Sequence, residues 1–422
     1  MESRREDIQK HIREVFPTIF TQDDLLTLIN YIHNELYAPY YAKLKKRVPR
    51  ISVKTFNYYK NIKLSGDVRY KTFSIPKKSG KPRIISAPAS GLKMIQECLN
   101  IIFQAFYTPN EYACGFVPNR NVSDGAKKHT NQPYVYNIDL KDFFDTITFP
   151  RVKAVLALPP FDLKDAREPI AYTIACLCCN PKEVTVIDAN GQETKEVRNC
   201  LPQGAPTSPI LTNMVCRTLD RRLAGLAKRY NARYSRYADD ITFSCIYNIF
   251  KKDSDFIKEL YRIVEEDQKL HINAAKTRLQ TASQRQEVTG LIVNQKVNVT
   301  KEYVKQVRQW LYYWEHYGLA RAQKYFLSKY KASKPIKKGQ PSIENVIAGK
   351  LDYMRMIVGE ANPSYRKLNE RYVALTGPVK VKPKKQKPQQ EPVLWKKHKV
   401  PKVNPEVEQN IGKLLDDILA NI

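Results

Sequence analysis

The segment Tyr234-Ser-Arg-Tyr-Ala-Asp-Asp-Ile-Thr-Phe-Ser-Cys245 determines the predicted fold of this 422-residue chain. After the acidic pair, apolar residues alternate with Thr and Ser, which is the pattern of a strand, and the residues before the pair fit a second strand. A tight turn between them places Asp239 and Asp240 at the tip of a β-hairpin. Adjacent carboxylates repel each other unless a cation neutralises them, and Mg²⁺ prefers such ligands. Taken alone, the two aspartates also fit an ordinary turn.

A second strand is predicted at Tyr134-Val-Tyr-Asn-Ile-Asp-Leu140. Alternate residues of a strand share a face, so Asp139 lies near the end of a mostly apolar strand. A strand end beside a hairpin tip can bring three carboxylates, those of Asp139, Asp239 and Asp240, around two metal ions. That geometry activates a 3′-hydroxyl and stabilises departing pyrophosphate, so it predicts nucleotidyl transfer.

Two other segments contain residues suited to contacts with nucleotides. Leu201-Pro-Gln-Gly-Ala-Pro-Thr-Ser-Pro-Ile-Leu-Thr-Asn213 is a turn-rich loop that becomes helical, in which Gln203 and Gly204 could contact a nucleotide or a template base. Ile75-Pro-Lys-Lys-Ser-Gly-Lys-Pro-Arg-Ile-Ile85 predicts a β-hairpin with a basic turn. Its basic residues are Lys77, Lys78, Lys81 and Arg83. Glycine-rich loops and solvated basic turns are common, so neither segment identifies a site alone.

The composition favours a polyanionic partner. Lysine and arginine total 71 against 42 acidic residues, a net charge of +29, which points first to nucleic acid, although a protein can also simply be basic. The N-terminal MESRREDIQK has no signal-peptide core and no apolar run reaches membrane-spanning length, so we expect a cytosolic protein that does not enter a membrane. Eight cysteines without zinc-ligand spacing predict buried, reduced thiols.

The pattern of the sequence changes along the chain, which predicts an α+β protein with several parts. The first 50 residues have helical spacing, with Thr21 as an N-cap and Asp24 three places later. Short β-rich runs separated by helices extend from about 68 to 300, and helices return from 301 to 376.

The C-terminal part differs from the rest. Gly359 and Asn362-Pro363 are expected to end a helix. Residues 377–404 are rich in lysine and proline, which predicts an extended basic linker. Residues 405–422 carry an amphipathic stripe, and this predicted helix docks either on the body of the protein or on a partner.

Three ordered motifs resemble the successive palm motifs of reverse transcriptases. They are Asn137-Ile-Asp-Leu-Lys-Asp-Phe-Phe144, Leu201-Pro-Gln-Gly-Ala-Pro-Thr-Ser208 and Tyr237-Ala-Asp-Asp240. The chain is most similar to bacterial retron-type and related defence-associated reverse transcriptases, which it resembles over about residues 65 to 376. It shares with them Gly115-Phe116, Glu287-Val-Thr-Gly-Leu291 and Gly349-Lys350-Leu351.

This resemblance implies a right-hand polymerase, to which the residue patterns add N-terminal helices and a basic C-terminal extension. The implied parts are N-terminal helices 1–50, fingers 51–133, palm 134–300, α-helical thumb 301–376, linker 377–404 and terminal helix 405–422. The implied activity is RNA-directed DNA synthesis from dNTPs with two Mg²⁺ ions, for which Mn²⁺ can substitute. The template would be a structured noncoding RNA in bacterial antiphage defence. The terminal helix would bind RNA, an effector protein or a second copy of the chain.

The resemblance also assigns roles in the metal and nucleotide site. Asp139 and Asp239 would be the principal metal ligands and Asp240 the supporting one. Leu140 would join the metal and nucleotide site through its backbone, and Gln203 with Gly204 would belong to the nucleotide pocket.

Other roles follow position by position. Phe144, five residues after Asp139, matches the steric gate that crowds a ribose 2′-hydroxyl, while Phe143 is expected in the core. Arg83 and Lys77 match the residues of the fingers that grip triphosphate. Lys276 matches a lysine that protonates pyrophosphate, although an ordinary surface lysine fits equally.

The strand terminus and the duplex have expected contacts as well. Gly290 matches the primer grip, where a small residue lets a strand terminus lie against backbone. In the thumb, most of the aromatic residues Trp310, Tyr312, Tyr313 and Trp314 are expected in the core. The basic residues expected to face phosphate are Lys305, Arg308, Arg321 and Lys324.

Two other functions remain compatible with the sequence. One is a non-catalytic RNA-binding scaffold with a polymerase fold, which the intact triad disfavours. The other is template-independent nucleotide addition or RNA synthesis by the same palm. Between the first two motifs, the insert through Asn180-Pro-Lys-Glu-Val-Thr and Asp188-Ala-Asn-Gly191 contains no clear Asn-Ala-x-x-His signature associated with retrons. This absence weakens the assignment to retrons and leaves both a retron enzyme and another defence-associated reverse transcriptase open.

Overall fold

The computed structural model describes residues 2–76, 82–187, 193–331 and 340–377. The chain divides into two compact units, Met1–Leu375 and Thr376–Ile422, and the helices and strands described below lie in the first, apart from the last residue of one helix. The linker and terminal helix predicted for 377–422 therefore lie outside the described residues, except for Gly377.

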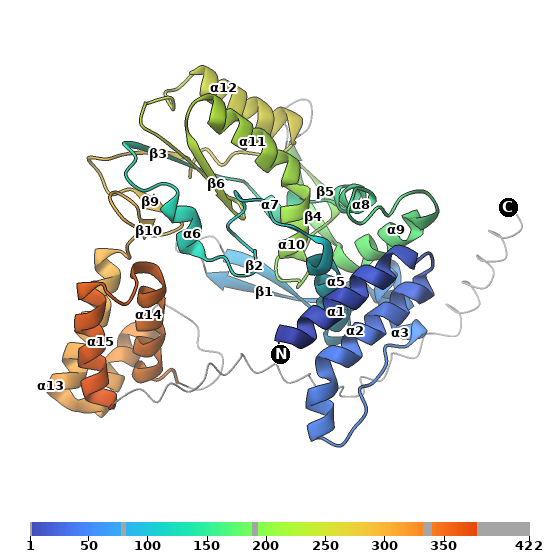
Figure 1. Ribbon diagram of the computed structural model, residues 1–422, viewed down its shortest axis with the longest axis horizontal. Helices are drawn as coiled ribbons and strands as arrows, with labels where there is room; N and C mark the ends of the chain where they lie inside the picture. The colour runs from blue at the N-terminus through green and yellow to red at the C-terminus, as the bar shows by residue number, and fades with distance from the viewer. Residues whose placement is uncertain (1, 77–81, 188–192, 332–339, 378–422) are drawn as a thin grey trace, which may run out of the picture. The chain divides into compact units, whose positions relative to one another are not determined.

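Helices form the N-terminal part of the chain, as the spacing of apolar residues predicts (Figure 1). Thr21 caps α2 with a capping box, because its Oγ1 accepts from Asp24 N at 3.2 Å while Asp24 Oδ2 accepts from Thr21 N at 2.9 Å. The predicted helix start is confirmed. The elements are α1 (Glu2–Val15), η1 (Phe16–Thr18), α2 (Gln22–Lys43), α3 (Val53–Lys60), α4 (Ile62–Ser65) and η2 (Gly66–Arg69).

A two-stranded hairpin follows these helices. β1 (Tyr70–Pro76) and β2 (Pro82–Pro88) pair antiparallel with Pro76 opposite Pro82, so the predicted hairpin around residues 75–85 is confirmed on both sides of its turn. The next helices are α5 (Ser90–Phe106), whose buried face packs on α1 and α2, and α6 (Val122–Lys127).

A four-stranded antiparallel sheet in the order β6-β7-β3-β8 carries the predicted motifs. Its strands are β3 (Tyr134–Asp139), β6 (Arg233–Tyr237), β7 (Asp240–Cys245) and β8 (Arg278–Thr281). α11 packs against β6, and Figure 1 shows α11 and α12 beside the sheet. The helices of this region are α7 (Phe143–Thr146), α8 (Phe149–Ala157), η3 (Asp165–Arg167), α9 (Glu168–Cys178), α10 (Ser208–Val215), α11 (Arg217–Arg229), α12 (Asp255–Tyr261) and the π-helix η4 (Arg262–Asp267).

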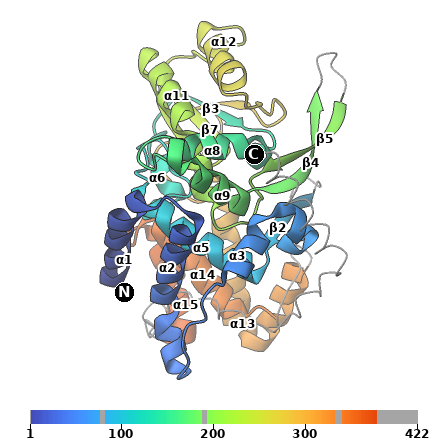
Figure 2. The same cartoon turned by 90° about the vertical axis from the view of Figure 1, so that its right-hand side faces the viewer.

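The insert between the first two motifs is a β-hairpin. β4 (Asn180–Ile187) pairs antiparallel with β5 (Glu193–Cys200) over their whole length, and the hairpin extends away from α8 and α9 in Figure 2. A second small hairpin consists of β9 (Glu287–Val288) and β10 (Leu291–Ile292). All eight cysteines are buried and none forms a disulfide, so the prediction of buried reduced thiols is confirmed.

The last helical segments of the described chain are α13 (Lys301–Lys331), which is broken by a kink at Gly318, α14 (Ile343–Val358) and α15 (Pro363–Thr376). α14 ends at Gly359, whose φ of 78° lies in the left-handed region that glycine adopts without strain, so the predicted helix end is confirmed. These helices share a hydrophobic core with β9 and β10 that includes Trp310 and Trp314. Tyr312, in contrast, is 45% exposed, so it does not belong to that core as its neighbours do.

His129 joins the two strands that carry the acidic pair. Its ring is fully buried, with Nδ1 at 2.7 Å from Ser244 Oγ on β7 and Nε2 at 2.8 Å from Ser235 Oγ on β6. Burial, together with the positive charges of Lys128 and Arg233, lowers the pKa of His129 to about 3. The neutral ring therefore holds this hairpin together at neutral pH.

We expect this histidine to make stability depend on pH. In the unfolded chain His129 takes up a proton near its ordinary pKa of 6.5, whereas the folded chain takes it up only near 3. Its contribution is complete above pH 6.5 and is lost as the pH falls toward 3, with a loss of about 2 kcal/mol at pH 5. Urea unfolding of wild type and His129→Gln at about pH 8 and about pH 5 measures this loss of unfolding free energy. The expectation fails if the substitution leaves the difference between the two pH values unchanged.

Candidate active site

The strand register brings the three predicted aspartates together. β3 pairs with β7 so that Asp139 lies opposite Asp240. β6 pairs with β7 so that Tyr237 lies opposite Asp240, which leaves Ala238 and Asp239 as the hairpin turn. Leu140 N donates to Asp239 O at 3.1 Å and fixes this turn against the end of β3. Carboxylates a hundred residues apart in sequence therefore meet at one edge of the sheet.

The pKa values of Asp239 and Asp240 are both raised above the ordinary aspartate value. Burial among protein atoms, followed by the charges of Asp239 and Asp139, raises the pKa of Asp240 to about 6, although part of its side chain meets solvent. Burial and the charge of Asp139 also raise the pKa of Asp239. Repulsion of this kind is relieved by a cation, and a donor set made only of oxygens suits Mg²⁺.

A lysine and an asparagine contact the first aspartate directly. Lys276 Nζ lies 2.8 and 3.0 Å from the two carboxylate oxygens of Asp139, and Asn273 Nδ2 donates to Asp139 Oδ1 at 3.0 Å. Asn273 N also donates to the Asp139 carbonyl at 2.8 Å. Within the described ranges, no three His, Cys, Asp or Glu side chains are close enough to form a ready-made metal cage. The chemistry of the donors fits a divalent cation, and Lys276 is the cation that Asp139 contacts in this structure.

Two arginines add positive charge at the site. Arg83 on β2 and Arg278 on β8 are both exposed. The charge of Arg83 acts on Asp239 and that of Arg278 on Asp240, and each opposes the upward shift in pKa that burial and the neighbouring carboxylates cause. Arg83 thus lies close enough to the acidic turn for its charge to act there, and its contact with triphosphate stays a prediction. Arg278 was not predicted from the sequence. Lys77 lies outside the described residues.

The loop before α10 packs against the β1–β2 hairpin. Gln203 O accepts a hydrogen bond from Ser86 N at 2.8 Å. Gly204 has a φ of 128°, and a Cβ there would lie 2.8 Å from Ser86 O and 2.9 Å from Ile85 Cγ2. Gly204 therefore lets the loop lie against β2, the strand that contains Arg83. Contact of Gln203 or Gly204 with a nucleotide stays a prediction.

The two phenylalanines after the first motif differ as expected. Phe143 is 3% exposed, whereas Phe144 is half-buried at the surface of the core. The Phe144 and Tyr237 rings each lie 6.4 Å from the ring of Phe116, measured between centroids. Phe144 thus lies in an aromatic group that includes the tyrosine preceding the acidic turn. Leu140 is buried, so any contact with a ligand would use its backbone.

Gly290 lies in a turn that needs its conformational freedom. The β9–β10 hairpin turns through Thr289 and Gly290, whose φ values are 49° and 81°, as a type I′ turn requires. A Cβ at Gly290 would meet no other atom within 4 Å, so backbone conformation rather than space selects glycine. Tyr303 and Tyr353 line a pocket beside this turn. The primer-grip role stays a prediction.

Sequence comparison identifies the family. Residues 75–309, more than half of the chain, match the family described as reverse transcriptase (RNA-dependent DNA polymerase).

No helix among the described residues is long and apolar enough to cross a membrane.

Curated relatives show which kind of reverse transcriptase the chain is similar to. Retron Mx65 reverse transcriptase of Myxococcus xanthus is 36% identical over 58% of this chain and 55% of its own length. Retron Mx162 reverse transcriptase of the same species is 33% identical over 53% of this chain and 47% of its own length. The chain thus spans about half the length of these two relatives. Retron Ec86 reverse transcriptase of Escherichia coli is 30% identical over 62% of this chain and 74% of its own length.

These matches favour the retron type over another defence-associated enzyme, because the curated relatives are retron reverse transcriptases although the Asn-Ala-x-x-His signature has no clear copy here. Together with the right-hand palm built on Asp139, Asp239 and Asp240, they show that this chain belongs to the reverse transcriptase family and is a member of its retron type.

Proposed function

We propose that this chain is an RNA-directed DNA polymerase that copies a structured noncoding RNA into DNA. The observation that carries the proposal is the register of β3 and β7, which sets Asp139 opposite Asp240 beside the turn that holds Asp239. The retron reverse transcriptases among the relatives support the RNA template. The proposed setting, antiphage defence in the bacterial cytoplasm, rests on the resemblance of the motifs to those of defence-associated reverse transcriptases. A scaffold that only bound RNA would have no need for three carboxylates at one sheet edge.

The three aspartates hold the metal ions in this proposal. Asp139 and Asp239 are the main ligands, Asp240 supports them, and the Leu140 backbone completes the set. Two Mg²⁺ ions, or Mn²⁺ in their place, supply activation of the primer hydroxyl and stabilisation of the charge on the leaving group.

Cationic residues orient the nucleotide. Arg83 presents a forked donor to the triphosphate, and Lys77, six residues earlier in the sequence, is the second candidate for this contact. Lys276 changes its partner from the Asp139 carboxylate to the leaving pyrophosphate, to which it gives a proton as a general acid. Gln203 and Gly204 face the incoming base, while Gly290 lets the primer terminus lie against the backbone.

The nucleic acid also contacts the C-terminal helices in this proposal. Lys305, Arg308, Arg321 and Lys324 are all exposed on α13, where they can track a phosphate backbone. Residues 405–422, outside the described residues, would serve RNA binding, an effector protein or a second copy.

The test is to purify the chain from cells that express its native locus and to sequence the nucleic acid that copurifies. The matched control is the double variant Asp239→Asn, Asp240→Asn, which removes two charges without changing side-chain size. The proposal requires a discrete RNA with complementary DNA on the wild type and RNA alone on the variant. RNA without DNA on both proteins would support the scaffold instead, and DNA unrelated to the RNA would support template-independent addition.

Phe144→Val is expected to admit ribonucleotides. Loss of the ring removes the group that would collide with a 2′-hydroxyl, and steric discrimination of this kind is worth about 10- to 100-fold in kcat/KM. Steady-state extension with dNTP and rNTP measures the ratio. Phe143→Val is the control, because Phe143 is 3% exposed and its loss should lower stability without changing the ratio. Equal discrimination by Phe144→Val and wild type would exclude the gate.

A further inference from the structure

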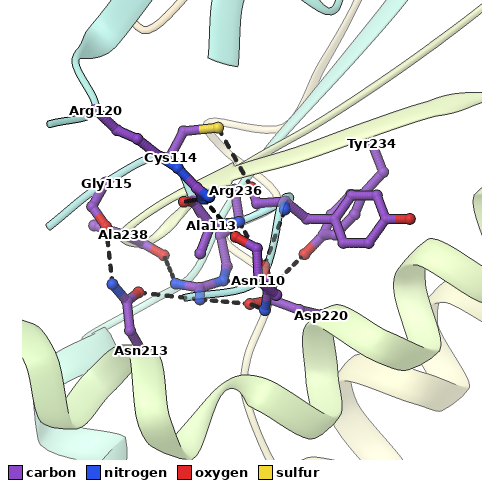
Figure 3. Close-up of polar contacts among 11 residues, drawn as sticks. Asn110, Ala113, Cys114, Gly115, Arg120, Asn213, Asp220, Tyr234, Arg236 and Ala238 are labelled. Atoms are coloured by element: carbon purple, nitrogen blue, oxygen red, sulfur yellow. Dashed lines mark hydrogen bonds and ion pairs between the residues drawn. The ribbon is translucent and has the colours of Figure 1, made fainter. Parts of the chain in front are cut away.

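A fully buried arginine holds the backbone next to the catalytic turn. Arg236 is 0% exposed, and its Nη1 donates to the Ala238 carbonyl at 3.1 Å (Figure 3). That carbonyl belongs to the peptide bond that leads into Asp239. The orientation of this peptide sets the direction in which the Asp239 side chain leaves the turn. Arg236 itself is too deeply buried to touch a nucleotide.

The turn adopts a conformation that needs support. Ala238 has a φ of 57°, in the left-handed region that a residue with a Cβ adopts only at an energetic cost. On the other side of the turn lies Gly115, where a Cβ would be 2.8 Å from Ala238 N. The turn is thus clamped between the backbone of Gly115 and the guanidinium of Arg236.

The guanidinium is fixed by a buried carboxylate. Arg236 Nε and Nη2 donate to the two oxygens of Asp220 on α11, each at 2.7 Å. The same carboxylate accepts from Tyr234 Oη and from Asn110 Nδ2, both at 2.8 Å. Asp220 and Arg236 are both 0% exposed, and every nitrogen of the guanidinium has an acceptor. When every polar group of a buried ion pair has a hydrogen-bond partner, the network holds the two side chains in a single arrangement.

Asn213 on α10 links both sides of the clamp. Its Oδ1 accepts from Arg236 Nη2 at 3.1 Å, and its Nδ2 donates to Gly115 O at 2.9 Å. The contacts therefore form a closed ring from Arg236 through Asn213 and Gly115 to Ala238, and back to Arg236. Figure 3 shows these side chains converging from α10, α11 and β6 on the turn.

We propose that Arg236, held by Asp220 and Asn213, is a positioning residue that fixes the peptide between Ala238 and Asp239 and so aims the Asp239 carboxylate at the metal ions. The inference rests on the proposed function, because it concerns the metals of that reaction. Partners that orient metal ligands typically change metal affinity by about 10- to 100-fold when they are removed.

The test uses Asn213→Ala and Arg236→Lys in the full chain. Asn213→Ala opens the ring but keeps the buried ion pair, so it is the variant more certain to fold. Arg236→Lys keeps the charge but has no fork that can reach Asp220 and Ala238 together. Asn30→Ala is the matched control, because Asn30 also uses its side chain to hold backbone, with bonds of 2.8 and 3.1 Å to Ile51, but lies in α2.

Two readouts separate positioning from a loss of stability. The first is the Mg²⁺ concentration at half-maximal primer extension, which should rise about tenfold or more in Asn213→Ala and Arg236→Lys, with the KM for dNTP nearly unchanged. The second needs no activity: the rise in melting temperature that saturating Mn²⁺ gives the wild type should shrink in both variants. Asn30→Ala should have a lower melting temperature than the wild type. Its Mg²⁺ concentration at half-maximal extension and its rise in melting temperature with Mn²⁺ should equal those of the wild type.

The outcomes distinguish this inference from the proposed function. Asn213→Ala and Arg236→Lys could have lower melting temperatures but respond to Mg²⁺ and Mn²⁺ as Asn30→Ala does. In that case the network only stabilises the fold, and the inference is overturned. If the wild type extends no primer on any template, the proposed function fails, and the shift in melting temperature with Mn²⁺ alone decides the inference. A wild type that shows no such shift overturns the inference as well.

Discussion

Asp139→Asn is expected to lower the rate of primer extension by about a thousandfold or more while the chain stays folded. Asparagine has the same size but lacks the charge that a metal ligand supplies at this position. Asp139 is 9% exposed and lies opposite Asp240 in the sheet, and in the proposal Asp239 and Asp240 already serve as ligands themselves. Lys276 loses its charged partner, but its side chain is 56% exposed and water can solvate it. The effect on stability should therefore be small.

The matched control is Asp142→Asn, three residues along the chain. Asp142 is exposed and has a φ of 46°, a conformation that asparagine tolerates as well as aspartate does. Single-turnover extension of a DNA primer on an RNA template, together with the affinity for RNA, measures both variants. Asp142→Asn should match the wild type. If Asp139→Asn kept more than about a tenth of the wild-type rate, Asp139 could not be a metal ligand.

The palm strands could be predicted because their sequences repeat with the period of a strand. The strand predicted at 134–140 is β3 at Tyr134–Asp139, and the turn predicted at Asp239 separates β6 from β7. Local rules also located the N-cap at Thr21 and the helix end at Gly359, since each depends on residues within one turn. Family motifs then selected Asp139 from the other aspartates of the chain.

Residues that act across long sequence distances could not be predicted. Asn273 lies outside a strand and contacts Asp139 only because the loop before β8 folds back on β3. Arg278 begins β8, and the register of that strand against Asn137 brings its charge near Asp240. Neither residue shows a pattern in sequence. Asn273 lies three residues before Lys276, so the only hint of its role in the sequence was the resemblance that identified the lysine.

The buried ion pair of Asp220 and Arg236 could not be predicted from the sequence for a different reason. Arg236 lies in a strand that sequence periodicity identifies, but the pattern cannot tell whether a charged residue faces solvent or a partner. Asp220 lies in the first turn of α11, where an acidic residue is ordinary. Only the packing of α11 on β6 joins the two, so the pair is a property of the tertiary structure.

Asp220→Ala is the second large effect expected of this chain, and it concerns stability. Removal of the carboxylate leaves the Arg236 guanidinium buried without a counter-charge, which typically lowers the free energy of unfolding by about 3–5 kcal/mol. Tyr234 and Asn110 also lose the acceptor that they share. Urea unfolding measures the change, with Glu315→Ala as the control. Glu315 pairs with Arg371 at 2.6 Å, but both side chains meet solvent, so its loss should cost less than about 1 kcal/mol.

A double variant shows whether charge or packing causes the loss. Asp220→Leu combined with Arg236→Met replaces both partners by apolar groups, which removes the uncompensated charge, so it should destabilise less than Asp220→Ala alone. The same double variant still lacks the donor to the Ala238 carbonyl, so its metal affinity should be low although it regains part of the stability that Asp220→Ala loses. If the double variant were as unstable as Asp220→Ala, packing of the pair rather than its charge would hold α11 against β6. Recovery of stability without recovery of metal affinity would instead separate the two tasks of Arg236: it neutralises Asp220, and it holds the backbone from which Asp239 projects.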